Sequence, residues 1–266
     1  MHAPLNRRLF LRRSLVWSCG LVAAPGLLHG RASANGKLHV GFIGVAHRAA
    51  ENLAEIARLT DAVNVAALCD VDDKFLAEAR VKHPAARTYN DFRRLLDQAD
   101  LDAVVVSTPD HTHAVAVAAA LRSGRHVYCE KPLTRTVSEC RAVRALAAES
   151  KRVTQLGTQI HAGSNYRRVV ELIRAGVLGA VREVHVWCGA RYGEKQEPTR
   201  GRPVPPELHW DLWLGPVPFR EYSPDYAPFN WRHWWAFGGG VLADFGCHFM
   251  DPVSYTHLTL PTIYSV

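Results

Sequence analysis

Short apolar runs alternate with amphipathic stretches along the chain from Lys37 onward. Such runs are typical of buried strands, and the stretches between them repeat their apolar residues at helical spacing. Because strands and helices alternate, the pattern predicts an α/β fold with a parallel, doubly wound sheet covered on both faces. The expected strands are Leu38–Ile43, Asn64–Cys69, Ala103–Ser107, Val127–Cys129 and Val153–Leu156. The expected helices are Ala49–Leu59, Lys74–Val81, Phe92–Gln98, His113–Arg122 and a helix that ends at Ser150.

Capping signals mark the ends of several of these helices. Gly124 stands where a left-handed residue ends a helix, and Gly176 does the same for a further helical stretch at Arg167–Ala175. Thr136 and Glu139 have the spacing of a capping box, which begins the helix that ends at Ser150.

The pattern changes after Leu156. The segment Arg182–Trp187 alternates like a half-exposed strand, and residues 190–230 are rich in proline, glycine and aromatic residues. We therefore expect a Rossmann-type domain over residues 35–156 and a second domain of α+β character over residues 157–252.

The first 34 residues have the features of an export signal. The pair Arg7 and Arg8 precedes an apolar stretch, and small residues at positions 32–34 form a cleavage site. The apolar stretch is too short and too flanked by positive charge for a spanning helix. We expect a twin-arginine signal over residues 1–34, a periplasmic or exported protein, and no stable membrane anchor after cleavage. The alternative is a basic, disordered start.

Charge and cysteine content exclude two classes of function. The net charge is +7, but residues 1–34 hold five arginines and no acid, which leaves +2 for the rest. No basic patch remains, so no nucleic-acid partner is expected. The cysteines beyond residue 34 form no C-x-x-C pair, so neither a disulfide framework nor a metal site is expected.

The last residues, 253–266, differ from what precedes them. Their first ten letters, VSYTHLTLPT, are the translation of a common transposase sequencing adapter. We expect residues 253–266 to be an adapter-derived, non-native tail, so that the natural sequence is cut near Asp251. Different codons in the nucleotide record would contradict this expectation.

Candidate cofactor residues follow the first strand, because ligands bind outside the carboxyl ends of strands in a doubly wound sheet. The segment GVAHRA begins at Gly44 and stands where a G-x-G-x-x-G/A dinucleotide fingerprint belongs. Gly44 allows the tight turn, whereas the methyl group of Ala46 replaces a glycine that lets backbone amides approach a pyrophosphate. The segment predicts cofactor contacts by Gly44, Ala46, His47 and Arg48.

Further candidates follow the next strands. Asp70 ends the second strand, where an acid accepts hydrogen bonds from ribose hydroxyls and repels a 2′-phosphate, so NAD is expected over NADP. Asp72 either assists it or caps a helix. The segment STPDHTHA supplies the candidate cofactor residues Thr108, Pro109, His111 and His113. Helix capping is an alternative role for the two histidines, which have no third metal ligand at a suitable spacing.

Two segments hold candidate catalytic residues. In HVYCEKPLT an apolar strand ends at Glu130, Lys131 and a proline, and such a tip is either a solvated turn or a site. Asp244 and His248 lie four residues apart, so they share one helix face, either as a site or as a surface pair. Trp231 precedes Asp244 in a segment rich in tryptophan, which fits a sugar pocket or an aromatic core.

Together these motifs resemble the Gfo/Idh/MocA oxidoreductases, the sugar and inositol dehydrogenase family. The resemblance rests on the fingerprint at Gly44 and on the segments CDVD, STPDHTHA, EKPL and GGGVLADFGCHFMD. It runs from about Lys37 to Asp251, and the EKP and D-x-x-x-H elements are its most specific parts.

The resemblance implies roles for the candidate residues. Lys131 is expected beside the nicotinamide, hydrogen-bonded to the substrate hydroxyl, with Glu130 and Gln159 also near the cofactor. His248 is expected to remove the hydroxyl proton, because imidazole titrates near neutral pH. Asp244 is expected to bind substrate hydroxyls or orient that base. The substrate-binding set is Lys131, Trp231, Arg232, Asp244 and His248.

The expected function is NAD(P)-dependent hydride transfer between a secondary hydroxyl of a sugar, inositol or related polyol and nicotinamide. Two alternatives stay open: an NAD-dependent glycoside hydrolase that acts by transient oxidation and elimination, and a non-catalytic nucleotide-binding module. The family builds its second domain on a largely antiparallel sheet whose remaining strands would lie beyond Asp251. We therefore expect the chain as written to be inactive, and the full-length protein to be a homo-oligomer.

Overall fold

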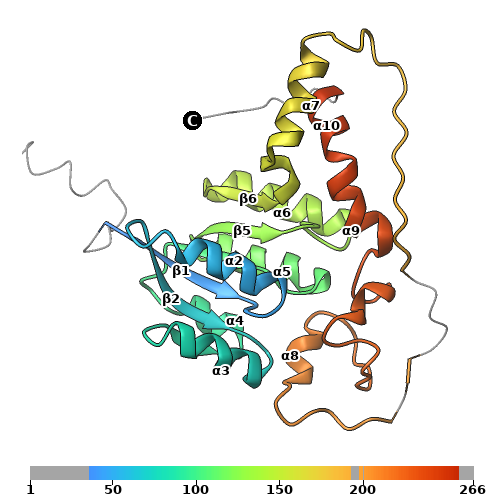
Figure 1. Cartoon of the computed structure of the whole chain (residues 1–266). Helices are drawn as coiled ribbons and strands as arrows, with labels where there is room; N and C mark the ends of the chain where they lie inside the picture. Colours follow the sequence, from blue (N-terminus) through green and yellow to red (C-terminus); the bar gives the residue numbers. More distant parts are fainter. Residues whose placement is uncertain (1–35, 193–197, 200, 258–266) are drawn as a thin grey trace, which may run out of the picture. The chain divides into compact units, whose positions relative to one another are not determined.

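The structure is a computed structural model that describes residues 36–192, 198–199 and 201–257 (Figure 1). A six-stranded parallel sheet has the strand order β3-β2-β1-β4-β5-β6. Its strands are β1 (Leu38–Ile43), β2 (Val63–Cys69), β3 (Arg87–Tyr89), β4 (Ala103–Val106), β5 (His126–Glu130) and β6 (Thr154–Gly157). The order reverses between β1 and β4, which is the switch point where sheets of this kind bind ligands.

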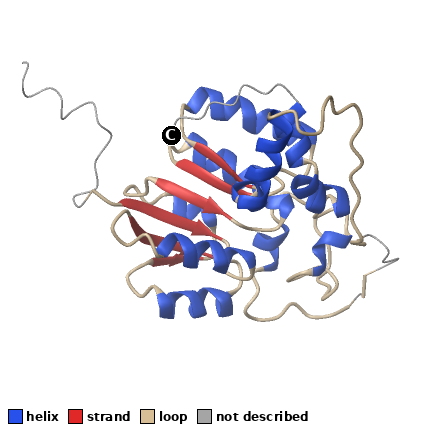
Figure 2. Ribbon diagram, turned by 45° about the horizontal axis from the view of Figure 1, so that its top comes forward, coloured by secondary structure: helices blue, strands red, loops and turns tan. Residues whose placement is uncertain are grey.

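Helices cover both faces of the sheet (Figure 2). They are α2 (Arg48–Ala57), α3 (Asp73–Lys82), α4 (Phe92–Leu96), α5 (Asp110–Arg122) and α6 (Val137–Ser150). Helices α2 and α3 pack against the face that carries Phe42 and Leu68, whereas α4, α5 and α6 pack against Val104 and Val106. These four strand side chains are fully buried, as a continuous apolar strand requires. The predicted α/β fold with a doubly wound parallel sheet is confirmed.

The predicted capping signals form as expected. Thr136 and Glu139 make a complete capping box at the start of α6. Gly124, at φ +80°, follows α5, and the Arg125 N–H bonds back to the Ala120 carbonyl, which closes a Schellman motif. The short strand β3 was not predicted, because three residues are too few to show a period.

The rest of the described chain holds short helices and loops. These elements are η2 (Gln159–Ala162), α7 (Ser164–Arg174), α8 (Trp210–Leu214), η3 (Asn230–His233), α9 (Gly240–Phe249) and α10 (Asp251–His257). No β-strand occurs among the described residues from 158 to 257. The strand predicted at Arg182–Trp187 is therefore wrong in this structure. Val184 and Val186 remain exposed there, since no described segment lies beside them to complete a backbone ladder.

One loop of this second part pairs with the edge of the first. The Asp73 N–H donates to the Glu207 carbonyl and the His209 N–H donates to the Val71 carbonyl, both at 2.9 Å. Between them, Asp72 and Leu208 form an isolated antiparallel bridge. Beyond this bridge, an aromatic cluster forms around Trp210, Trp213, Tyr226, Trp231 and Phe237. The loop is thereby fixed at the carboxyl end of β2.

The predicted segments at the two ends lie partly or wholly outside the described residues. The twin-arginine signal, residues 1–34, lies wholly outside them. The predicted non-native tail overlaps α10, and its last residues, 258–266, lie outside. In the described part of the chain, no helix has both the length and the apolar character needed to span a membrane.

Candidate functional site

Two adjoining cavities open at the carboxyl ends of the strands. The larger has a volume of about 270 Å³ and is lined by Gly44, Asp70 and Phe75 among others; we call it the Asp70 cavity. The smaller, of about 180 Å³, is lined by Lys131 and Asp244 among others; we call it the Lys131 cavity. The residues that line both are Ala46, His47, Ser107, Thr108, Pro109 and Pro228. The two cavities therefore adjoin and together form the candidate site.

The loop after β1 makes the tight turn that the sequence predicts. Gly44 has φ +88°, and a Cβ atom there would lie 2.6 Å from the Ser107 carbonyl oxygen. The turn therefore needs a glycine for both its dihedral angle and its space. His47 has φ +52°, a conformation that is uncommon outside glycine. The loop consequently directs Ala46 and His47 toward the space shared by the two cavities.

Asp70 organises this loop. Its carboxylate accepts hydrogen bonds from the Val45 N–H at 3.0 Å and from the Asp72 N–H at 3.1 Å. Burial raises the pKa of Asp70 to about 6, although these backbone hydrogen bonds act in the opposite direction. Asp72 caps α3 by accepting hydrogen bonds from the Lys74 and Phe75 N–H groups. The helix cap is one of the two roles that the sequence predicted for it.

Glu130 is buried and holds a polar network at the end of β5. Its carboxylate accepts from Asn52 Nδ2 at 2.8 Å and from Arg48 Nε at 3.2 Å. Arg48 also contacts Glu51, so two carboxylates engage the guanidinium that was predicted to contact the cofactor. Asn52 was missed by the sequence prediction. Its signal was a polar residue one turn after Arg48 on the apolar side of α2.

Lys131 contacts α9 across the Lys131 cavity. The Lys131 Nζ atom donates to the backbone carbonyl of Asp244 at 3.0 Å and forms an ion pair with its carboxylate. The Lys131–Pro132 peptide bond is cis. Arg232 Nε lies 3.7 Å from the same carboxylate, and Tyr192 also hydrogen-bonds it. Burial alone raises the pKa of Asp244, but Lys131 and Arg232 outweigh it and bring the pKa below its usual range.

His248 lies one helical turn after Asp244 on α9. It is 9% exposed, and its Nδ1 atom has no hydrogen-bond partner among the described residues. Burial lowers the pKa of His248, and the positive charge of Lys131 lowers it further. The imidazole is consequently neutral at neutral pH, but His248 is not among the residues that line either cavity.

His111 and His113 do not line either cavity. Both are 1% exposed, and their ring nitrogens face backbone carbonyl oxygens of Trp213, Pro132 and Thr108. This differs from the predicted cofactor contact and from the capping alternative, because α5 begins at Asp110, before both histidines. Thr108 and Pro109 do line both cavities, as a cofactor contact requires.

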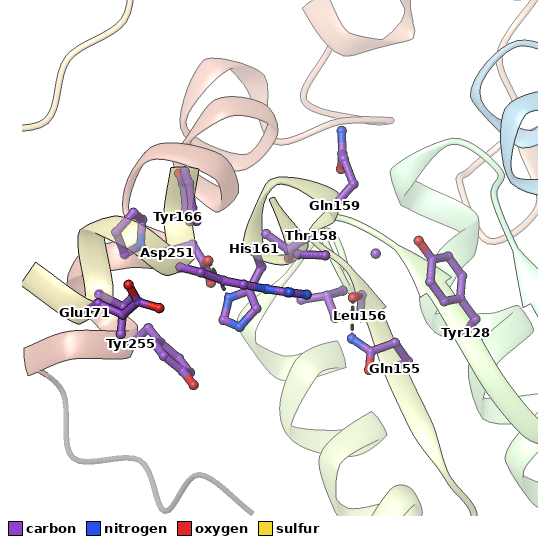
Figure 3. A pocket seen from close by; sticks show the side chains of 15 residues that line it. Tyr128, Gln155, Leu156, Thr158, Gln159, His161, Tyr166, Glu171, Asp251 and Tyr255 are labelled. Carbon is purple, nitrogen blue, oxygen red and sulfur yellow. Dashed lines mark hydrogen bonds and ion pairs between the residues drawn. The ribbon is translucent and has the colours of Figure 1, made fainter. Parts of the chain in front are cut away.

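The remaining predicted residues divide between two places. Trp231 and Arg232 line the Lys131 cavity, where the guanidinium lies over the Trp231 ring at 4.1 Å from its centroid. Gln159 instead lines a separate cavity of about 600 Å³ beside η2, α7 and α10 (Figure 3). His161 Nδ1 lies at hydrogen-bond distance, 2.7 Å, from an Asp251 carboxylate oxygen at that cavity. The structure thus does not bring Gln159 together with the predicted cofactor residues.

Comparisons with known proteins agree with the fold. The Gfo/Idh/MocA family model described as an oxidoreductase family with an NAD-binding Rossmann fold matches residues 38–158. The family's C-terminal alpha/beta domain matches residues 163–259, which includes the start of the tail predicted to be non-native.

Several curated relatives match part of the chain. Inositol 2-dehydrogenase of Salmonella paratyphi B is 29% identical over 168 residues, which are 62% of this chain and 49% of that protein. Alpha-N-acetylgalactosaminidase of Shewanella oneidensis is 30% identical over 203 residues, which are 66% of this chain and 44% of that protein. The chain therefore spans about half the length of the curated relatives it matches, or less.

Solved structures share the fold. An NAD-binding protein from Listeria innocua has a TM-score of 0.59 at 20% identity, with coverage of 83% of this chain and 55% of that one. Scyllo-inositol dehydrogenase from Lactobacillus casei, solved with NAD(H) and scyllo-inositol, has a TM-score of 0.51 at 24% identity, with coverage of 54% and 42%.

Proposed function

Since this chain belongs to the Gfo/Idh/MocA oxidoreductase family, we propose that the whole protein is an NAD(P)-dependent oxidoreductase. It moves a hydride between a secondary hydroxyl of a sugar, inositol or related polyol and nicotinamide. The observation that carries this proposal is the contact of the Lys131 amine with Asp244 of α9 at the Lys131 cavity. That contact joins the ligand edge of the sheet to the helix that also carries His248.

The residues present fit a dinucleotide. The Asp70 cavity and the Lys131 cavity adjoin, which suits an elongated ligand, and the glycine turn at Gly44 leads into α2, whose N-terminus favours phosphate. The Asp70 carboxylate lines the far end, where it favours ribose hydroxyls over a 2′-phosphate. NAD is thus the proposed cofactor in preference to NADP. When bound, the nicotinamide ring accepts or returns the hydride.

Three side chains of this chain have separate roles in the proposed reaction. Lys131 donates a hydrogen bond to the reacting hydroxyl and Asp244 orients that amine. The neutral His248 takes the hydroxyl proton while the hydride leaves the same carbon, so that the carbonyl product forms with its charge balanced. The lowered pKa of His248 is consistent with this role, because a base must be unprotonated to accept.

Glycoside hydrolysis by transient oxidation is a second candidate. It is favoured by the similarity to the alpha-N-acetylgalactosaminidase of Shewanella oneidensis. The retained lysine of the EKP segment favours plain dehydrogenation instead. The two chemistries differ in one product, since the hydrolase releases a sugar without net reduction of the cofactor.

A substrate screen on the whole protein tests the proposal. Polyols and sugars are supplied with NAD, and the absorbance of reduced nicotinamide is followed together with sugar release from model glycosides. Formation of free NADH supports dehydrogenation, sugar release without NADH supports hydrolysis, and neither signal supports a non-catalytic nucleotide-binding module. The Lys131→Met variant is expected to lose NADH formation. Lys151→Met, at an exposed lysine, is the matched control and is expected to keep it.

We also propose that the protein is exported by the twin-arginine route and that it forms a homo-oligomer. The arginine pair at Arg7 and Arg8 supports the first proposal, and the resemblance to the family supports the second. A reporter fused to residues 1–34 is expected to be exported, and substitution of both arginines by lysine is expected to stop export. Sedimentation of the whole protein tests its oligomeric state.

A further inference from the structure

Two buried histidines in the first turns of α5 meet different surroundings. His111 and His113 are each 1% exposed, and both lie close to backbone carbonyl oxygens. They differ in how many of their ring nitrogens meet such an oxygen. That difference determines which protonation state each ring can adopt.

Both nitrogens of His113 face acceptors. Nδ1 lies 2.7 Å from the Pro132 carbonyl oxygen, and Nε2 lies 2.8 Å from the Thr108 carbonyl oxygen. A carbonyl oxygen only accepts, and a neutral imidazole carries only one N–H group. The neutral ring would therefore place a nitrogen lone pair against an oxygen lone pair at hydrogen-bond distance, in a buried site. Only the doubly protonated ring satisfies both contacts.

His111 provides the contrast within the same helix. Its Nε2 atom lies 2.8 Å from the Trp213 carbonyl oxygen, whereas its Nδ1 atom has no partner among the described residues. A neutral ring with a single N–H group, on Nε2, is sufficient for this contact. Burial lowers the pKa of His111 to about 4, so this ring is neutral at any pH near 7.

The charged and titratable groups around His113 are compatible with a cation. Burial lowers its pKa, but Cys129, Asp110 and the Pro132 carbonyl outweigh burial and raise the pKa to about 10. Asp110, one turn before His113, is buried and has a pKa of about 6, so it is ionised at neutral pH and offsets the charge.

We propose that His113 is a buried imidazolium cation that ties the loop after β4 to the Lys131–Pro132 turn and so positions the Lys131 amine. The ring bonds the residue next to Lys131 on one side and Thr108, which lines both cavities, on the other. It is a positioning residue, since it touches neither cavity. Its value for catalysis rests on the proposed function, but the protonation state and the position of Lys131 do not.

Nuclear magnetic resonance tests the protonation state without any turnover. The full chain is labelled with ¹⁵N-histidine, and long-range ¹H–¹⁵N spectra are recorded from about pH 6 to pH 8.5. His113 is expected to show two protonated nitrogens throughout, and His111 one protonated nitrogen and one bare nitrogen. The variants H113Q and H111Q assign the signals by their loss, and through-bond assignment in the unsubstituted chain replaces either variant that fails to fold. A neutral His113 overturns the proposal.

A second measurement tests the positioning of Lys131. Acetylation of each lysine is followed by peptide mass spectrometry in the unsubstituted chain, in H113Q and in V143A, a core variant of α6. The Lys131 side chain is 13% exposed and ion-paired, so its acetylation is expected to be slow and to become several-fold faster in H113Q. Exposed Lys151 is expected to react equally in all three. If V143A accelerates Lys131 as much as H113Q does at equal loss of stability, the positioning role is overturned.

Discussion

Three carboxylates near the candidate site titrate differently because burial and charge act on them in different proportions. Burial prevails at Asp70 and at Asp110, where it raises each pKa to about 6. At Asp244 the nearby Lys131 and Arg232 prevail, and the pKa falls. The first two groups therefore reduce stability when they ionise, whereas the ionised Asp244 contributes stability that is lost as the pH falls through its folded-state pKa.

Replacing Asp70 by asparagine should change how stability depends on pH. In the folded state Asp70 binds a proton more tightly than in the unfolded chain, so its contribution is most favourable below about pH 4 and is lost as the pH rises through about 6. The loss amounts to about 3 kcal/mol. Urea denaturation at several pH values should therefore show Asp70→Asn gaining stability relative to the unsubstituted chain between about pH 4 and pH 7.

Asp97→Asn is the matched control for that experiment, because the Asp97 side chain is 71% exposed. Its stability relative to the unsubstituted chain should be almost independent of pH. A flat profile for Asp70→Asn as well would contradict the assignment of the pH effect to the buried carboxyl group.

Gly44→Ala should damage the cofactor loop. The added Cβ atom would lie 2.6 Å from the Ser107 oxygen, and φ is +88°. We expect a loss of about 2–4 kcal/mol in the free energy of unfolding, measured by urea denaturation. Gly176→Ala is the control, with φ +72° but no heavy atom within 4 Å of the added carbon. It should lose only about 1 kcal/mol, and equal losses would show that the contact with Ser107 is unimportant.

Individual site residues were predictable from sequence to different degrees. Lys131 and Asp244 were found because each belongs to a segment of specific spacing, and the structure places them in contact. Asn52 and Tyr192 were missed, because a polar residue on the apolar side of a helix, or in a loop, does not reveal its partner. The ring orientation of His113 was likewise unpredictable, since it depends on two loops distant in sequence.

At the scale of elements, prediction succeeded where the chain carries its own signal. The central strand β4 is continuously apolar, and the capping box at Thr136 requires only local hydrogen bonds. The segment Arg182–Trp187 shows the opposite case. Its alternation is real, but a strand forms only against another strand, and the described residues provide none beside it. The sequence period alone cannot reveal that dependence.

Thr136→Ala should weaken α6 by removing its N-terminal cap. The Thr136 hydroxyl accepts from the Glu139 N–H, while the Glu139 carboxylate accepts from the Thr136 N–H at 2.8 Å. Loss of the hydroxyl should cost about 1 kcal/mol, measured by thermal or urea unfolding. Arg141→Ala, at an exposed position of the same helix, is the control and should change stability little. Hydrogen exchange should accelerate mainly in the first turn of α6.

At the scale of the whole molecule, the sheet and the loops at its carboxyl edge together form the candidate nucleotide site. Added NAD should therefore stabilise the chain against unfolding. At about 100 times its dissociation constant, a ligand of the folded state contributes about 3 kcal/mol and raises Tm by roughly 5–10 °C. Thermal shift should show a smaller rise with NADP, whose additional phosphate approaches the Asp70 carboxylate. A larger rise with NADP would reverse the proposed preference.

The bridge between Asp72 and Leu208 has a kinetic consequence for that nucleotide. Pro205, Glu207 and Leu208 form one wall of the Asp70 cavity, and the two backbone hydrogen bonds of the bridge hold this wall to Val71 and Asp73. We expect a dinucleotide in the Asp70 cavity to leave more slowly while those bonds hold the wall in place. Exchange should then be governed by the motion of the wall rather than by affinity alone, and the protein should retain its nucleotide through purification and dialysis.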